Sequence, residues 1–150
     1  YDEMVIEDPY ECLKEIVESV PNVSPEQLHT TFNESGGNAE YAVWFLRVLV
    51  GCFLKTHAEE YTGFLFSSET FCEGMDMAMF VQREVEPMGR ECEQIQIMAL
   101  MNSFNLGVSI EYLGPEGRNK VTLPDNFHSP FPVNLLYRPG HYDILVESIL

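Results

Sequence analysis

The sequence has few positive charges. Its 150 residues include 8 Lys and Arg against 24 Asp and Glu, which gives a formal net charge of −16. A field of this sign repels the phosphate backbone of nucleic acids and anionic lipid surfaces, so we expect neither nucleic acid nor membrane as a partner. Basic protein surfaces suit such a charge, but solubility alone also explains it. The charge therefore excludes more partners than it identifies.

Cysteines are also few, and none has the spacing of a metal site. The sequence contains no C-x-x-C pair and no histidine at ligand spacing from its four cysteines, which are Cys12, Cys52, Cys72 and Cys92. This pattern offers no zinc or redox motif and is too sparse for a disulfide scaffold. We expect no metal site, and reduced thiols of the kind found in the cytosol or nucleus.

No apolar run is long enough to cross a bilayer. The longest run, 41–54, is interrupted by Arg47 and predicts a mostly buried helix. The sequence begins YDEM, with neither an initiator Met nor a charged-then-apolar leader, so we expect a further segment before Tyr1. The length and the 45% hydrophobic content suit one globular unit.

Capping residues followed by helical apolar spacing predict five helices. Four are expected at 9–20, 38–54, 77–85 and 91–104, and a shorter one starts at Ser24-Pro25 and ends at Gly36-Gly37. After Asn105 the apolar period becomes two, which predicts strands at 108–112, 135–137 and 144–146. Between the first and second of these strands, segment 114–132 contains four Pro and two Gly, which predicts a loop. Helices first and strands last indicate an α+β domain.

The segment LLYRPGHYDIL at 135–145 is the sharpest local feature. Pro139-Gly140 predicts a turn between two strands, with His141 and Asp143 two residues apart on the second. Side chains at i and i+2 share one face of a strand, roughly 7 Å apart at Cβ. A carboxylate there can orient the imidazole and stabilise its protonated form, as the third member of a catalytic triad does. Taken alone, however, such a pair is most often incidental.

Three blocks of sequence resemble the otubain branch of the ovarian-tumour (OTU) deubiquitinases. Segment 135–145 is similar to the closing segment of that family. EVEPM at 84–88, IQIMAL at 95–100 and VSIEY at 108–112 resemble its preceding helix and strand, and 41–54 resembles its central helix more weakly. The blocks keep family order over nearly the whole chain. The resemblance implies a papain-like cysteine-protease fold, with a helical mass packed on a small, mostly antiparallel sheet.

The same resemblance implies a ubiquitin-specific cysteine protease. It places the general base at His141 and the orienting acid at Asp143. A cysteine thiolate beside His141 would attack the isopeptide carbonyl between the C-terminal glycine of ubiquitin and a lysine amine. No metal or organic cofactor enters this chemistry. The implied partners are ubiquitin, polyubiquitin chains and ubiquitin-conjugating enzymes (E2), and the implied location is the cytoplasm or nucleus.

The nucleophile motif of the family is missing from this sequence. In otubains it is Asp-Gly-x-x-Cys, and it lies before the region that corresponds to Tyr1; none of the four cysteines follows such a motif. The resemblance therefore implies that 1–150 is the C-terminal portion of a single catalytic domain that lacks its nucleophile segment. We expect the isolated chain to be inactive.

The four cysteines of this sequence are weak candidates for the nucleophile. Cys12 lies early in a predicted helix, where the helix dipole favours a thiolate, but Glu11 opposes that effect. Cys52 is expected to be buried in the 38–54 helix. Cys72 and Cys92 lie in polar sequence with no basic neighbour expected to activate them.

The 114–132 loop supplies candidate substrate contacts. It occupies a position where the otubain family meets ubiquitin, so Phe127, His128 and Phe131 are candidates to touch substrate. An ordinary surface loop is the alternative interpretation.

Other residues around the predicted base have simpler interpretations. Arg138 and Tyr142 flank His141 in the sequence, and surface charge and packing are the favoured interpretations of these two. His29 and His57 are expected on solvated helix surfaces.

Two alternatives to a protease stay open. The chain could be a non-catalytic module that binds ubiquitin or an E2, as a fragment or a degenerate family member. It could also be a scaffold that keeps the closing segment for packing only. An Asp-Gly-x-x-Cys motif upstream of Tyr1 would favour the protease over both.

Overall fold

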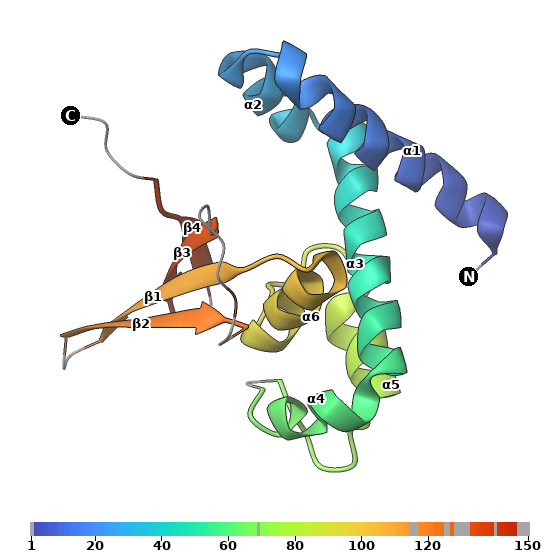
Figure 1. The fold of residues 1–150 in the computed structure, drawn as a ribbon. Helices are drawn as coiled ribbons and strands as arrows, with labels where there is room; N and C mark the ends of the chain where they lie inside the picture. The colour runs from blue at the N-terminus through green and yellow to red at the C-terminus, as the bar shows by residue number, and fades with distance from the viewer. Residues whose placement is uncertain are drawn as a thin grey trace. The chain divides into compact units, whose positions relative to one another are not determined.

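Helices occupy the first part of the chain and a four-stranded sheet the last part, as Figure 1 shows. The structure is a computed structural model that describes residues 2–68, 70–114, 117–124, 127, 133–139 and 141–146. In chain order its elements are α1 (Glu3–Ser19), η1 (Val20–Asn22), α2 (Pro25–Asn33), α3 (Asn38–Thr56), α4 (Ala58–Leu65), α5 (Met77–Phe80), η2 (Val81–Val85), α6 (Gln94–Phe104), β1 (Val108–Gly114), β2 (Gly117–Leu123), β3 (Val133–Arg138) and β4 (His141–Ile144). This order confirms the predicted α+β class.

Contacts divide the chain into two compact units, Tyr1–Leu49 and Val50–Leu150, which we describe in turn. The first unit contains α1, α2 and the first part of α3 around a small apolar cluster. Its buried members are Ile16, Ala39 and Ala42. Within the described residues, we find no helix with the length and apolarity needed to span a membrane.

The predicted start of the first helix at Pro9 is wrong. α1 begins at Glu3, and the carboxylate of its N-cap Asp2 accepts a hydrogen bond from the Met4 backbone N–H at 3.2 Å. Pro9 is buried inside the helix. Asp8, which precedes Pro9, has the stronger cap signature in the sequence, yet Asp2 is the cap that forms. The longer helix forms because its extra turns add backbone hydrogen bonds. These outweigh the N–H donor that an internal proline lacks and the strain that it introduces.

Two other predicted helix starts are confirmed. At the start of α2, the Ser24 hydroxyl accepts from the Gln27 backbone N–H at 3.2 Å, and the Gln27 side-chain oxygen accepts from the Ser24 N–H at 2.8 Å. These reciprocal bonds satisfy two donors that a helix end otherwise leaves open. α3 begins at the predicted Asn38.

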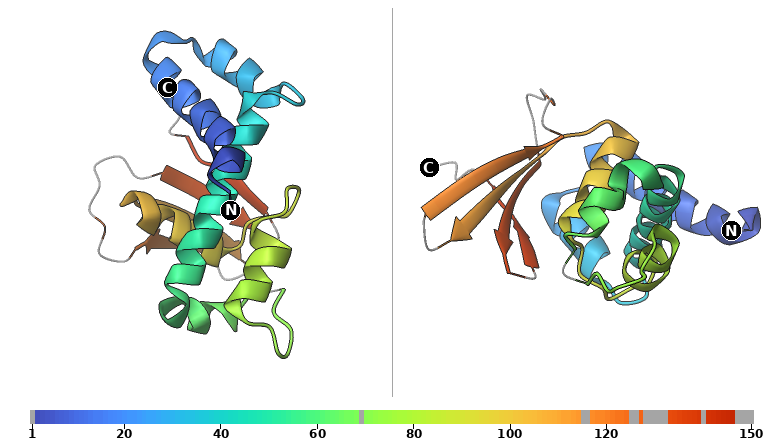
Figure 2. Two further views of the ribbon diagram at one scale, coloured as in Figure 1. Left: turned by 90° about the vertical axis from the view of Figure 1, so that its right-hand side faces the viewer. Right: turned by 90° about the horizontal axis from the view of Figure 1, so that it is seen from below.

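In the second unit, α6 lies between the sheet and the other helices (Figures 1 and 2). On one side, Ile95 and Ala99 pack into a helical core around the fully buried Phe80. On the other, Met101 packs with Ile110 of β1. Each large apolar side chain buried in this way contributes about 1.5–3 kcal/mol. α6 begins at Gln94, three residues later than predicted, because Glu93 is its N-cap.

The predicted helix over 77–85 changes type part-way. Its predicted cap is confirmed, since the Asp76 carboxylate accepts from the Met79 backbone N–H at 2.8 Å. After α5, however, the chain widens into the π-helical turn η2, and the Glu86 N–H donates to the Val81 carbonyl at 2.9 Å. A Cβ on Gly51 of α3 would lie 2.8 Å from Val81 Cγ1, so the glycine permits this close approach. Turns of this kind are frequent near functional sites.

The sheet has the strand order β2-β1-β3-β4, with β1 and β3 parallel and the two outer pairs antiparallel. The predicted loop over 114–132 is wrong in part, because it contains β2. This edge strand carries Arg118, Asn119 and Lys120, so its sequence lacks apolar alternation, and hydrogen bonding to β1 defines it instead. The last strand begins at His141, as expected after the turn at Pro139-Gly140, but it ends at Ile144 and so does not span the predicted 144–146.

Candidate active site

The β3–β4 hairpin brings His141 and Asp143 together at the edge of the sheet. Arg138 pairs with His141 in the strand register, and Leu136 pairs with Asp143. The His141 Nε2 lies 3.4 Å from the Asp143 Oδ1. The two side chains are 51% and 41% exposed, so the pair is open to a reactant. This is the contact that triad chemistry needs between an imidazole and its orienting acid.

A second carboxylate faces the other nitrogen of the ring. Glu91, which lies between η2 and α6, places its Oε2 3.7 Å from His141 Nδ1. Each ring nitrogen of His141 therefore faces one carboxylate. Glu91 could not be predicted from the sequence, because nothing in the local pattern relates it to a histidine 50 residues later in the chain.

Arg138 completes the cluster. Its Nη2 lies 2.5 Å from Asp143 Oδ2, so the two oxygens of Asp143 face different partners. Arg138 and Asp143 are diagonal neighbours across the hairpin, within reach of a long side chain. The interpretation of Arg138 as surface charge alone missed this contact, which depends on strand register.

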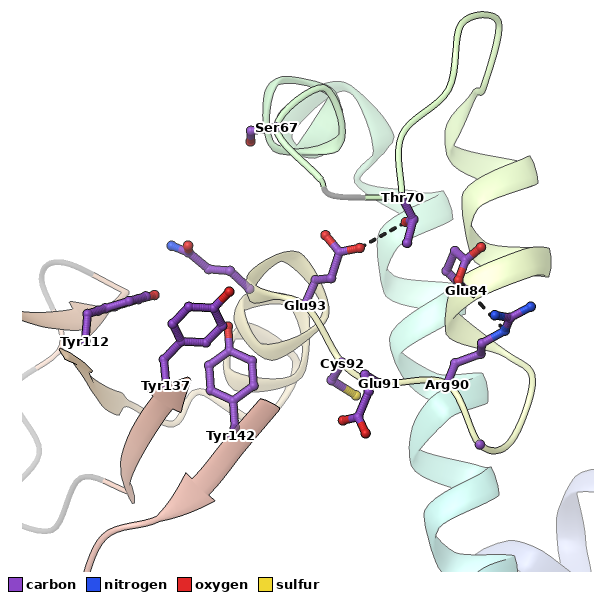
Figure 3. Close-up of a pocket in the computed structure, with 12 residues that line it drawn as sticks. Ser67, Thr70, Glu84, Arg90, Glu91, Cys92, Glu93, Tyr112, Tyr137 and Tyr142 are labelled. Carbon is purple, nitrogen blue, oxygen red and sulfur yellow. Dashed lines mark hydrogen bonds and ion pairs between the residues drawn. The ribbon is translucent and has the colours of Figure 1, made fainter. Parts of the chain in front are cut away.

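A cavity of about 460 Å³ lies beside the cluster, and Figure 3 shows its walls. Glu91 forms part of one wall together with Arg90, Cys92 and Glu93 of the same segment. The sheet supplies the opposite wall through the aromatic side chains of Tyr112, Tyr137 and Tyr142. Tyr142 lies between His141 and Asp143 on β4, and strand alternation turns it to the other face.

The three tyrosine rings contact one another in a row, each tilted against the next. The ring centroids are 5.1 Å apart between Tyr112 and Tyr137 and 5.0 Å apart between Tyr137 and Tyr142. Burial, and then the neighbouring tyrosines, raise the pKa of the Tyr142 phenol above its ordinary value. The predicted packing role of Tyr142 agrees with these ring contacts.

Hydrogen bonds anchor the segment that carries Glu91. The Glu93 Oε1 accepts from Ser68 Oγ and Thr70 Oγ1, both at 2.9 Å. The Glu93 N–H donates to the side-chain oxygen of Gln96, and the Gln96 amide nitrogen donates to the Glu84 carbonyl at 3.3 Å. α6, η2 and the loop after α4 thus fix this segment from three sides, and this holds Glu91 near His141.

The comparison with protein families decides the assignment. Residues 1–147 match the family model described as Peptidase C65 Otubain. The chain belongs to the otubain family.

Two relatives show how similar this chain is to known otubains. It is 34% identical over 150 residues to the human ubiquitin thioesterase OTUB1, covering 98% of this chain and 52% of the relative. It is 34% identical over 128 residues to the ubiquitin thioesterase otubain-like protein of Caenorhabditis elegans, covering 82% and 43%. The chain thus spans about half the length of the curated relatives that it matches.

Solved structures confirm the predicted OTU fold. A ceOTUB1 ubiquitin aldehyde UBC13~Ub complex superposes with a TM-score of 0.80 at 29% identity, covering 99% of this chain and 60% of that one. The family resemblance drawn from the three sequence blocks is therefore confirmed.

Two predictions for the cysteines of this otubain are wrong. Cys52 is exposed on α3, because it lies on the face of the helix that turns away from the core. Cys72 does have a basic neighbour, since Arg83 Nη1 lies 3.7 Å from its Sγ, a contact that folding brings about across 11 residues. Cys92 is exposed and lines the cavity, and Cys12 is half-buried.

The candidate substrate contacts fall largely outside the described residues. His128 and Phe131 both lie there. Phe127 is half-buried, and its ring occupies the space that a Cβ on Gly107 would need. A role of Phe127 in substrate contact stays a prediction.

The remaining histidines differ from each other. His29 is exposed, as expected. The expectation of a solvated surface is wrong for His57, which is half-buried and stacks on Phe53 with ring centroids 4.1 Å apart. Its Nδ1 lies 2.9 Å from the Phe53 carbonyl oxygen, so the end of α3 holds the ring in place.

Proposed function

We propose that this chain is the histidine- and acid-bearing part of a cysteine protease that hydrolyses isopeptide-linked ubiquitin. The observation that carries the proposal is the His141–Asp143 contact of 3.4 Å on the β3–β4 hairpin, in a chain that matches the otubain family over 1–147. The ubiquitin thioesterase names of the relatives support the same substrate.

In this mechanism His141 moves the protons. Asp143 holds Nε2, so Nδ1 is the nitrogen that faces the nucleophilic thiol. The thiolate sulfur bonds to the isopeptide carbonyl carbon, the carbon–nitrogen bond breaks, and His141 gives its proton to the departing lysine amine. Water, deprotonated by the same imidazole, then hydrolyses the thioester and releases ubiquitin.

The nucleophile belongs, in this proposal, to a segment that precedes Tyr1. The 150 residues contain no Asp-Gly-x-x-Cys motif. The relatives are about twice as long as the part that this chain matches. Residues 1–150 are then the C-terminal portion of one catalytic domain, and the four cysteines, which form no disulfide among the described residues, suit a reducing cytoplasmic or nuclear location.

Cleavage of a defined di-ubiquitin by the full-length protein tests the function. His141→Ala should lower the rate by at least about a thousand-fold, because one side chain provides both the base and the acid. Asp143→Ala should lose less, since the acid only orients and stabilises the ring. Ubiquitin affinity, measured by calorimetry, should survive both changes. Near wild-type cleavage by His141→Ala would remove the protease assignment.

A non-catalytic binding module is the second candidate. The favouring observation is that the similar ceOTUB1 structure is a complex with ubiquitin aldehyde and UBC13~Ub. If this candidate is right, the full-length wild-type protein binds ubiquitin or an E2~ubiquitin conjugate in calorimetry but cleaves no di-ubiquitin. The proposed protease is expected to do both.

A further inference from the structure

We propose that Arg138 is a positioning residue of this site, whose guanidinium holds the Asp143 carboxylate in the orientation that aligns His141. The inference rests on the proposed protease function and extends it to a residue outside the triad. The Arg138 Nη2 lies 2.5 Å from Asp143 Oδ2, and Asp143 Oδ1 lies 3.4 Å from His141 Nε2. Asp143 therefore bridges the cation and the imidazole.

The hairpin register makes this bridge short. Arg138 is the last residue of β3 and stands directly opposite His141, the first residue of β4. Paired residues share one face of a sheet, and Asp143 lies two positions further on the same face. All three side chains thus project from the same corner of the sheet. Only the turn at 139–140 separates Arg138 from His141 in the chain.

An orienting acid in this place needs a restraint. Asp143 is 41% exposed, so without a second partner its carboxylate could rotate toward solvent and leave the imidazole. A guanidinium supplies a planar, directional donor, whereas an ammonium supplies only a charge. Arg138 thus contributes geometry as well as charge.

Charge gives Arg138 a second effect. The charged groups that face His141 are Glu91 from the segment before α6 and Asp143 from β4, and Arg138 from β3 is paired with Asp143. Arg138 thus offsets the charge of one of the two carboxylates that face the imidazole.

The effect on folding should be small. Arg138 and Asp143 are 58% and 41% exposed, and exposed ion pairs contribute little to stability. A large kinetic loss with an unchanged melting temperature would thus point to the reaction. The sheet also offers a matched control, because Arg118 makes an ion pair with Glu111 across the β1–β2 hairpin, where no histidine is involved.

The test measures kcat and KM for di-ubiquitin cleavage by the full-length protein. Arg138→Gln should lower kcat about ten-fold with KM changed less than about two-fold, because a misplaced acid slows the chemistry and leaves binding intact. Arg138→Lys should recover part of kcat, because it restores the charge without the planar donor. Arg118→Gln should behave as wild type.

A double variant distinguishes a role in positioning Asp143 from a loss of activity that does not depend on Asp143. In an Asp143→Ala background, Arg138→Gln should cost nothing further, because the group that Arg138 holds is gone. Additive losses would overturn the proposal, as would an unchanged kcat in Arg138→Gln when the wild type is active. If Arg138→Gln fails to fold, a wild-type kcat in Arg138→Lys would overturn the directional role. No cleavage by the wild type, or normal cleavage by His141→Ala, would instead refute the protease function itself.

Discussion

At the scale of single residues, Glu91 and Asp143 divide the two nitrogens of His141 between them. Asp143 faces Nε2 and Glu91 faces Nδ1. In the proposed mechanism Nδ1 is the nitrogen that pairs with the thiolate. Glu91 therefore occupies the side of the ring that the thiolate would occupy in this mechanism. The Glu91 carboxylate must then either move away or interact with the imidazolium together with the thiolate.

This geometry predicts that Glu91→Gln speeds the reaction. Removing the carboxylate charge lessens its competition with the thiolate for the imidazolium, so kcat/KM for di-ubiquitin should rise about three-fold near neutral pH. Glu59→Gln in α4 is the control, because it removes an equal charge from an exposed position away from the cluster. A drop in kcat/KM for Glu91→Gln would show that Glu91 supports the base.

At the scale of elements, β1, β3 and β4 each place one tyrosine in the cavity wall, and the three rings contact one another. Burial raises the pKa of Tyr112 and, more strongly, that of Tyr142, so the folded state favours neutral phenols. In the unfolded chain a tyrosine ionises near pH 10. The stabilisation is thus fully present below about pH 10 and is lost as the pH rises from there toward the folded pKa values.

We predict that the free energy of unfolding falls as the pH is raised from about 9 to about 11, and that Tyr142→Phe reduces this slope. Urea unfolding at a series of pH values measures both. Tyr41→Phe is the control, since Tyr41 is 53% exposed, and it should leave the slope unchanged. Equal slopes for wild type and Tyr142→Phe would contradict a buried, neutral phenol at this position.

Local signals predicted some elements well and failed at others for identifiable reasons. The caps Ser24 and Asp76 mark true helix starts, because each satisfies a backbone donor that only a helix end leaves open. Asp8 has the same signature but lies inside α1. β2 and the π-helical turn η2 were missed, because β2 is defined by its pairing with β1, and no local pattern announces a wider turn.

At the scale of the whole molecule, the chain supplies only part of the catalytic groups that the proposed mechanism needs. It spans about half the length of its curated relatives and carries no Asp-Gly-x-x-Cys motif. In that mechanism the nucleophilic thiol must come from another segment of the protein.

We predict that residues 1–150 alone form no adduct with a ubiquitin probe that bears a C-terminal electrophile. The full-length protein should form one, because adduct formation needs a thiolate held beside His141. Mass spectrometry of the product, with iodoacetamide labelling to show that the thiols of the short chain are reactive, measures this. An adduct of the short chain at Cys92, which lines the cavity, would place the nucleophile within these residues.

The amino-acid sequence by itself determined the family, the α+β class and the short spacing of His141 and Asp143. The family followed from the resemblance of whole sequence blocks, such as 135–145, to otubains. The class and the spacing depend on local order along the chain: caps, apolar periods and the alternation of a strand. Only the tertiary structure decided that Glu91 reaches the same ring and that Arg138 shares the Asp143 carboxylate. These contacts depend on strand register and on the packing of α6 and η2 beside the sheet, and a linear pattern does not encode which distant side chains a fold brings within 4 Å.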